Sequence, residues 1–305
     1  MLVEDLQIIL KVAELKSITA AAEHLDLRVA TASAAIKRVE KSLGVELFTR
    51  TTRSLRLSNS GERYIPECQQ ALALLSSAKK NVKNDLGIID DELKLSASSD
   101  LGRNLVLPWL DEFMEEHKDL SLKLHISDSN IDFFRDAVDV ALRYGDPSNS
   151  NFYGFKICDV PKVICACSSY LKEFGTPEHP SELVSHNALL YQLHDITFNI
   201  WNFQDSGSPV KVKVTGNRVT NDADLVRRWC VAGKGIAAKS CLDMAEDLLA
   251  GRIKTVLTDY QPKPMELWLI CPSRQLITPA VRLLRDLLIA RCNEILKQLQ
   301  LSKII

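Results

Sequence analysis

The chain has 305 residues, of which 46% are hydrophobic and 25% are charged, and its formal net charge is −1. This composition is typical of a globular protein of two or three domains and excludes a uniformly basic nucleic-acid coat protein. The sequence has no apolar run of 18 residues, and its first charged residues, Glu4 and Asp5, are acidic. We therefore expect neither a transmembrane segment nor a signal peptide, which predicts a cytoplasmic protein.

The segment from Ser17 to Gly61 has the spacing of a helix, a short turn, a second helix and a basic hairpin. Ser17 is a candidate N-cap for an Ala-rich helix over residues 19–25, and residues 26–28 form the turn. Apolar residues then recur at steps of three and four over residues 29–43, which predicts a helix with one buried face. The residues on this face are Ala32, Ile36, Val39 and Leu43.

A basic hairpin is predicted after the second helix, because Arg50, Arg53 and Arg56 alternate with apolar residues there. Residues 28–63 hold eight Lys or Arg and three Glu, a net charge of +5, whereas residues 1–27 carry −3. The positive charge is therefore concentrated where DNA phosphates would lie. An ordinary amphipathic helix with a solvated basic face is the alternative for one helix alone. The adjoining hairpin favours a winged helix-turn-helix that binds DNA.

This segment resembles the DNA-binding domain of the LysR-type transcriptional regulators. Members of that family place a winged helix-turn-helix first, then a long linker helix, then a two-lobed effector domain that resembles the periplasmic binding proteins. The resemblance implies an α/β multidomain fold with domains at 1–58, 59–88 and 89–305, the last divided into lobes of 92–161 with 266–305 and of 162–265. It is carried by Ala21, Ala22, Leu25, Ser33, Ile36, Glu40, Leu43, Gly44, Leu47, Phe48, Arg50, Arg53, Leu57 and Gly61.

Two positions depart from the family pattern at the expected DNA interface. Val29 stands where Gln is common and Ala34 where Arg is frequent, so two donors for base recognition are missing. We expect Lys37 and Arg38 to bind phosphate, while Arg53 matches the family position that enters the minor groove. The predicted DNA-binding residues are Arg28, Val29, Ala30, Thr31, Ser33, Ala34, Lys37, Arg38, Arg50 and Arg53.

A single long helix is predicted over residues 58–86, where apolar residues follow coiled-coil spacing. The alternative is a helix that packs on its own domain. Because the stripe lies between two domains, we expect it to pack against a second copy, and two-fold symmetry then requires a near-palindromic operator. The predicted dimerisation residues are Ile65, Cys68, Leu72, Leu75 and Val82.

Strands and helices alternate after residue 92, which predicts an α/β domain. Polar residues follow three of its strands, and ligands collect at the carboxyl ends of strands and at helix N-termini in such sheets. Each polar run alone could be a helix cap. The resemblance implies that a small polar effector binds there, between the lobes. The predicted effector-binding residues are Ser98, Ser99, Asp100, Ser127, Asp128, Ser129, Arg143, Tyr144, Gln192, Asn221 and Asp222.

The eight cysteines include no CxxC pair, so we expect no zinc site, no other metal and no cofactor. Cys165 and Cys167 would lie on one side of a strand, which leaves a redox-responsive regulator as an alternative, although neither has a neighbouring cation. A small-molecule-binding protein without DNA specificity is another. The sequence lacks a GxSxG nucleophile elbow and a correctly spaced phosphate loop, so we do not expect an enzyme.

The sequence thus predicts a DNA-binding transcriptional regulator whose activity a small metabolite modulates. The resemblance implies that the effector closes the lobes and changes how dimers pack into a tetramer, and thereby the DNA bend. The expected partners are double-stranded DNA with a near-palindromic promoter site, a small-molecule effector, further copies of the chain and RNA polymerase. We expect no membrane partner.

Overall fold

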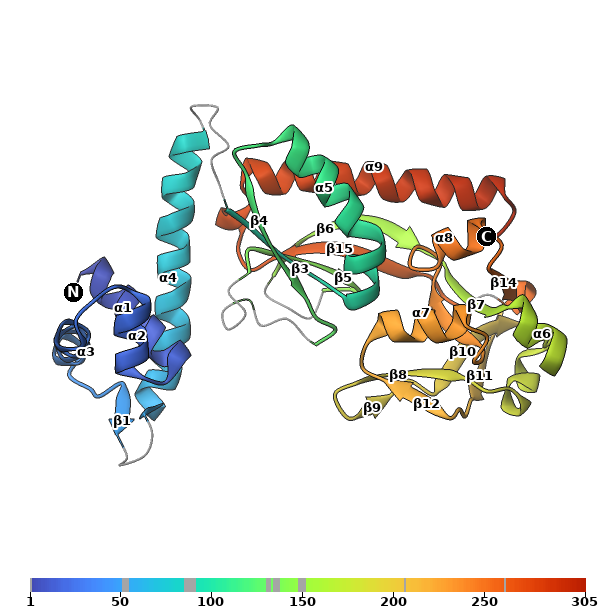
Figure 1. The fold of residues 1–305 in the computed structure, drawn as a ribbon, viewed down its shortest axis with the longest axis horizontal. Helices are drawn as coiled ribbons and strands as arrows, with labels where there is room; N and C mark the ends of the chain where they lie inside the picture. Colours follow the sequence, from blue (N-terminus) through green and yellow to red (C-terminus); the bar gives the residue numbers. More distant parts are fainter. Residues whose placement is uncertain are drawn as a thin grey trace. The chain divides into compact units, whose positions relative to one another are not determined.

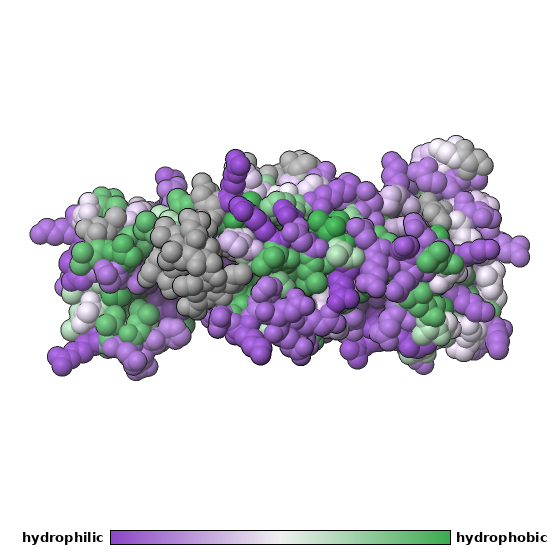
Figure 2. All heavy atoms as spheres, turned by 90° about the horizontal axis from the view of Figure 1, so that it is seen from above, coloured by the Kyte–Doolittle hydropathy of each residue, from purple (hydrophilic) through white to green (hydrophobic). Residues whose placement is uncertain are grey.

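The computed structural model describes residues 2–50, 55–84, 92–129, 133, 138–147, 152–205, 207–260 and 262–305. The chain forms an N-terminal unit within residues 1–88 and a C-terminal unit built from residues 89–131 and 138–305 (Figure 1). Across the described ranges, no helix is both long and apolar enough to cross a membrane. Hydrophilic side chains cover much of the face in Figure 2, with hydrophobic groups between them.

Helices and a hairpin build the N-terminal unit around a small core of alanine and branched aliphatic side chains. Ser17 caps the second helix, because its hydroxyl accepts a hydrogen bond from the backbone N–H of Ala20. Gly44 ends the third helix in the left-handed conformation, with φ of 71°. The elements are α1 (Val3–Leu15), α2 (Ile18–His24), α3 (Val29–Leu43) and the antiparallel strands β1 (Phe48–Arg50) and β2 (Leu55–Leu57).

The long helix α4 (Asn59–Asn84) begins in close contact with the hairpin. A Cβ atom on Gly61 would lie 2.2 Å from the carbonyl oxygen of Leu47, so only glycine fits there. Ile65 and Cys68 are buried in the core of the N-terminal unit. The first turns of α4 therefore pack on their own domain, which corrects the prediction that these two side chains face a second copy.

The rest of the predicted dimerisation stripe is less covered. Leu72 is half-buried and Leu75 is 56% exposed, and Leu74 beside it is also exposed. The side chain of Val82 lies outside the described part of the chain. The apolar surface that α4 leaves uncovered thus begins about two turns later than the sequence pattern indicated.

A five-stranded mixed sheet forms the first lobe of the C-terminal unit, in the order β4-β3-β5-β15-β6. β3 is parallel to β4 and β5, and β15 is antiparallel to β5 and β6. The strands are β3 (Glu92–Ala97), β4 (Ser121–Ile126), β5 (Val140–Tyr144), β6 (Tyr153–Val160) and β15 (Met265–Cys271). The helices are the π-helical η1 (Leu101–Val106), α5 (Leu107–Glu116), η4 (Arg274–Leu276) and α9 (Pro279–Leu301), which packs along β6.

The second lobe contains three small sheets, ordered β13-β7-β14, β12-β8-β9 and β10-β11. Its strands are β7 (Lys162–Cys167), β8 (Leu189–Leu193), β9 (Ile196–Thr197), β10 (Ile200–Asp205), β11 (Ser208–Lys213), β12 (Arg218–Thr220), β13 (Ala237–Ser240) and β14 (Ile253–Val256). Its helices are α6 (Ser168–Phe174), η2 (Pro180–Ser185), α7 (Ala223–Val231), α8 (Ala245–Leu249) and η3 (Thr258–Tyr260). One hydrophobic core runs through both lobes.

Candidate DNA interface and interlobe site

The helix α3 has a buried face and an open face, as its periodicity predicts. Ala32, Ala35, Ile36 and Val39 are buried in the core of the N-terminal unit. The open face begins in the turn before the helix. Its exposed members are Arg28, Val29, Ala30, Thr31 and Lys37, and Ser33 and Ala34 are half-buried. A helix face with small groups and an exposed cation can approach a DNA groove closely.

Arg38 has a partner within the domain. Its Nε and one terminal nitrogen donate hydrogen bonds of 3.1 and 2.5 Å to the two carboxylate oxygens of Asp5 on α1. The hydrogen bond from Arg38 is the main cause that lowers the pKa of Asp5. The carboxylate of Asp5 is almost fully buried, whereas the Arg38 side chain is half exposed. Arg38 therefore holds α3 against α1, and its contact with phosphate stays a prediction.

The sequence contains a signal for this pair. Asp5 precedes Ile9 by four residues and Ile8 by three, so it lies on the buried face of α1. An ionised carboxylate on that face requires a cationic partner. The pattern does not say which of the basic residues of the domain supplies it.

Glu40 joins the end of α3 to the wing. Its Oε1 accepts hydrogen bonds from the backbone N–H groups of Leu47, at 2.8 Å, and Phe48, at 3.2 Å. This carboxylate therefore fixes the start of β1 relative to α3. Of the two predicted wing residues, the side chain of Arg50 and all of Arg53 lie outside the described part of the chain.

In the C-terminal unit, Asp128 connects the two lobes. Its carboxylate accepts hydrogen bonds from the backbone N–H and hydroxyl of Ser99, at 2.6 and 2.5 Å, and from the backbone N–H of Ala223, at 2.7 Å. The hydroxyl of Ser99 in turn accepts from the backbone N–H of Asp224, at 3.2 Å. The starts of η1 and α7 are thus held together by one carboxylate and one hydroxyl.

Asp222 caps α7 and also reaches the first lobe. Its Oδ1 accepts from the backbone N–H groups of Asp224 and Leu225, and its Oδ2 accepts from Arg103 at 3.1 Å. Burial alone would raise the pKa of Asp222, but the hydrogen bonds, with that of Arg103 foremost, leave it below its usual value. Asp222 is therefore both the N-cap of α7 and a contact between the lobes.

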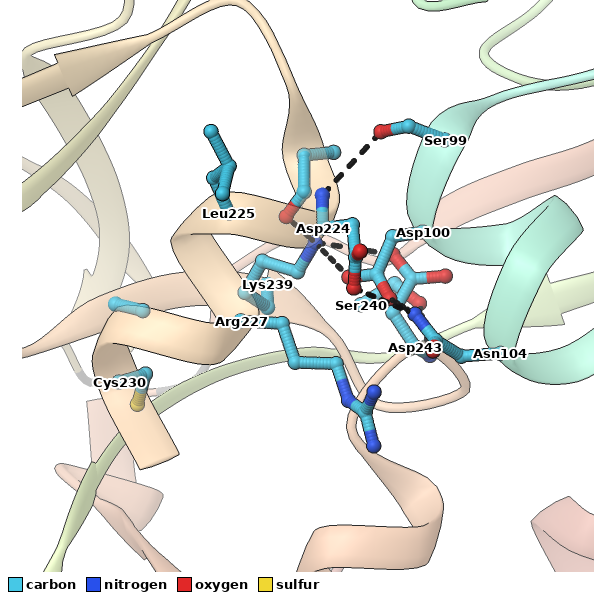
Figure 3. A network of polar contacts seen from close by, with 12 residues as sticks. Ser99, Asp100, Asn104, Asp224, Leu225, Arg227, Cys230, Lys239, Ser240 and Asp243 are labelled. Carbon is cyan, nitrogen blue, oxygen red and sulfur yellow. Dashed lines mark hydrogen bonds and ion pairs between the residues drawn. The ribbon is translucent and has the colours of Figure 1, made fainter. Parts of the chain in front are cut away.

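A buried ionic cluster lies next to these contacts (Figure 3). The ammonium of Lys239 on β13 forms ion pairs with Asp100 and, at 3.6 Å, with Asp243. The amide of Asn104 donates hydrogen bonds of 2.8 Å to both Asp100 and Asp224, which bridges the lobes. Asp100 is 1% exposed, so it is buried between the lobes rather than open to a ligand.

Lys239 was not among the predicted site residues. It lies in a strand whose neighbours are small and apolar, and a lysine in a buried strand needs a carboxylate partner. That signal was present in the sequence, but Asp100 is distant along the chain and its pairing depends on how the lobes meet.

Arg143 and Tyr144 at the end of β5 have different surroundings. Arg143 donates hydrogen bonds to the hydroxyl of Ser96, at 2.8 Å, and to the carbonyl oxygen of Leu142, at 2.9 Å. The hydroxyl of Tyr144 lies 2.8 Å from that of Ser240 and donates to Asp243 at 2.8 Å. Burial, and secondly the charge of Asp243, raises the pKa of Tyr144 well above its usual value.

The remaining predicted effector residues have local roles or lie at the surface. The carbonyl oxygen of Ser98 accepts from the N–H of Gly102, and the hydroxyl of Ser127 accepts from the N–H of Ser129. Gln192 donates to the carbonyl oxygen of His194 in its own hairpin. Asn221 is exposed.

The cysteines do not support the pairing considered from the sequence. The sulfur of Cys165 lies 3.9 Å from that of Cys230, and the sulfur of Cys167 lies 2.9 Å from the hydroxyl of Ser169. All eight cysteines are buried. No group of three or more His, Cys, Asp or Glu side chains suited to a metal ion occurs among the described residues.

Comparisons with known proteins cover nearly the whole chain. Residues 3–62 match the bacterial regulatory helix-turn-helix protein, lysR family, and residues 89–293 match the LysR substrate binding domain. The HTH-type transcriptional regulator DmlR of Escherichia coli strain K12 is 28% identical over 282 residues, which are 92% of each chain.

Solved structures of two full-length regulators resemble the chain. AphB, a virulence activator of Vibrio cholerae, shares 26% identity with a TM-score of 0.58, over 95% of this chain and 99% of that chain. CrgA of Neisseria meningitidis, a LysR-type transcriptional regulator, shares 26% identity with a TM-score of 0.61, over 94% and 97%. With a helix-turn-helix DNA-binding domain followed by an effector-binding domain, the chain belongs to the LysR family of transcriptional regulators.

Proposed function

We propose that the chain binds near-palindromic promoter DNA as a dimer or tetramer and that a small polar effector, bound between the lobes of the C-terminal unit, controls this binding. The domains would be residues 1–58, 59–88 and 89–305. The proposal rests on the exposed face of α3 in the N-terminal unit. In the C-terminal unit, polar residues at the starts of η1 and α7 join the two lobes.

The DNA contacts would come from the open face of α3 and from the wing. Thr31 and Ser33 offer hydroxyl groups for base edges, and Lys37 offers a cation for phosphate. Val29 and Ala34 offer only methyl groups, which suit thymine. Arg50 and Arg53 would extend the interface to the minor groove, while Arg38 would support it from behind through Asp5.

The effector contacts would come from residues next to the interlobe hydrogen bonds. Asp128 and Asp222 now use their carboxylates to hold the lobes together. A ligand that offers hydroxyl or amine groups could compete for those carboxylates, and Arg143 could receive a carboxylate of the ligand. Ligand binding would then change the contact between the lobes and, through it, the assembly of dimers. RNA polymerase is a further proposed partner.

Footprinting on DNA from upstream of the protein's own coding region, at several salt concentrations, tests the DNA-binding half of the proposal. We expect a protected near-palindrome that Thr31→Val and Lys37→Ala weaken and that Lys172→Ala, in the second lobe, leaves unchanged. Protection that is smeared along the fragment and lost steeply with salt would mean that only phosphate attraction remains.

Arg143→Ala tests the effector half. The variant should lose the response to small polar metabolites, measured as a ligand-induced shift in melting temperature, and keep operator binding. Equal loss of both would show that Arg143 is needed for the fold, through its hydrogen bond to Ser96.

A further inference from the structure

The buried contact between the lobes holds more carboxylates than cations. The ammonium group of Lys239 lies at the centre of this contact and forms ion pairs with Asp100 and Asp243. Asp224, the third carboxylate, is paired on the solvent side with Arg228 at 2.9 Å. One buried ammonium thus serves two buried carboxylates. Two like charges in a medium of low dielectric constant repel each other strongly, and a proton on one of them relieves the repulsion.

Asp100 is the more deeply buried of the two carboxylates that face Lys239, with 1% of the residue exposed against 8% of Asp243. Its Oδ1 accepts a hydrogen bond from Asn104, and its Oδ2 is paired with the ammonium of Lys239. Asp243 has the same ammonium nearby and also accepts from the hydroxyl of Tyr144. Hydrogen bonds to the charged form keep a carboxylate ionised. Burial disfavours the charged form of a carboxyl group, so a proton that enters the cluster goes to the more deeply buried Asp100.

We propose that Asp100 is a proton-operated latch between the lobes, which binds a proton when the lobes meet and so makes the interlobe contact tighter in mild acid than in mild base. The inference rests on the proposed function, because it treats the interlobe region as the regulatory site. It states that a proton, as well as a small molecule, regulates the contact between the lobes.

The sign follows from the two states of Asp100. When the lobes separate, Asp100 meets water and its pKa returns to about 3.9. When the lobes meet, burial is the largest influence and raises the pKa of Asp100 to about 7, with Asp243 acting in the same direction and Lys239 opposing both. The closed contact therefore binds more protons than the open one, so it gains stability as pH falls through 7 and loses it as pH rises.

Other charged and titratable groups lie near Asp100 in the part of the chain that the structure describes. They come from η1, the segment after β4, β5, α7, β13 and the turn after β13. They are Arg103, Asp128, Tyr144, Asp222, Asp224, Arg228, Lys239 and Asp243.

Amide hydrogen exchange of the full-length, DNA-free protein reads this contact directly. The N–H groups of Ala223 and Asp224 donate hydrogen bonds across the lobes, so their protection reports interlobe opening. After correction for the intrinsic pH dependence of exchange, a pKa of about 7 predicts about tenfold higher protection at pH 6 than at pH 8.

Two variants and a control make the result specific. Asp100→Asn keeps the shape of a neutral side chain, so protection should become independent of pH between 6 and 8. Asp243→Asn removes the repelling charge and keeps an acceptor for Tyr144, so the midpoint of the pH dependence should move to lower pH. Asp119→Asn, at the surface of the first lobe, should behave as the unsubstituted protein.

The inference is overturned if protection of these amides is the same at pH 6 and pH 8, or if Asp100→Asn retains the full pH dependence, because another group would then titrate. A midpoint that Asp243→Asn leaves in place would also refute the charge imbalance as its cause. Footprinting in the absence of any pH change tests the proposed function separately, so the two can fail independently.

Discussion

Replacing Glu40 with alanine should release the start of the wing from the helix α3. The substitution removes the single oxygen that accepts hydrogen bonds from the backbone N–H groups of Leu47 and Phe48. Both residues are buried, so their N–H groups have no ready access to water. The loss should therefore appear as easier local opening at the start of β1 rather than as unfolding of the whole protein.

The size of the effect follows from the two hydrogen bonds. A hydrogen bond to a charged group contributes about 1.5–3 kcal/mol, and the longer of these two contributes at the low end. With partial compensation by water we expect a loss of about 2–4 kcal/mol, which corresponds to a fall in amide protection of about 30-fold to 700-fold. Hydrogen exchange of peptides that cover residues 44–50 measures it, and peptides from β3 in the C-terminal unit serve as the internal reference.

Two further variants separate the hydrogen bonds from general effects of charge. Glu40→Gln keeps an acceptor oxygen without the charge and should give an intermediate loss. Glu46→Ala removes an exposed carboxylate from the same loop and should leave protection unchanged. If Glu40→Ala lowers protection by less than threefold, or if Glu46→Ala lowers it equally, Glu40 does not hold the wing.

Four other substitutions have defined outcomes. Gly61→Ala would push a Cβ to 2.2 Å from the carbonyl oxygen of Leu47 and should destabilise the N-terminal unit by about 1–3 kcal/mol, measured by far-UV circular dichroism on urea titration. Lys37→Ala should lower the slope of log K against log salt by about 0.9 without changing that stability, whereas Arg38→Ala should lower the stability itself. Asp128→Asn should weaken the hydrogen bond from the backbone N–H of Ala223, and with it the interlobe contact, by about 1–3 kcal/mol. The fluorescence of the four tryptophans, all in the C-terminal unit, measures this change.

The sequence was sufficient for elements with a clear period. The helix over residues 29–43 was predicted to the residue, and the fold class is confirmed, because an amphipathic stripe and its basic face are local properties. The strands β6, β8, β9, β10, β12 and β14 were not predicted. β6 carries glycine, lysine and aspartate among its apolar residues, and β12 has only three residues, so neither shows a hydrophobic run or a clean alternation.

The candidate sites were predictable only in part, and for a related reason. Ser99, Asp128 and Asp222 follow strands or start helices, which are local features, and the structure places them in hydrogen bonds between the lobes. Their contact with an effector stays a prediction. The roles of Arg38 and Lys239 depend on which carboxylate each side chain meets. Those partners are decided by packing between elements far apart in the chain, and periodicity carries no information about them.

The pKa values of the two buried aspartates of these pairs are shifted in opposite directions. The hydrogen bond from Arg38 lowers the pKa of Asp5, and the ion pair stabilises the N-terminal unit at neutral pH. Burial, assisted by the charge of Asp243, raises the pKa of Asp100 against the opposing effect of Lys239, so its contact is strongest in mild acid. Asp5 therefore stays ionised and holds α1 to α3 near neutral pH, whereas Asp100 changes its protonation state in that range.

An acid titration of one sample should therefore separate the two units. Between pH 8 and pH 6 the interlobe amides should gain protection while those of α1 and α3 stay constant, because Asp5 is ionised throughout that range. As pH falls below about 3.9, the unfolded N-terminal unit binds a proton that Asp5 in the folded unit resists, so the N-terminal unit should lose stability there. Loss of protection in both units over the same pH range would show that a global charge effect, and not the local balance around each aspartate, governs the response.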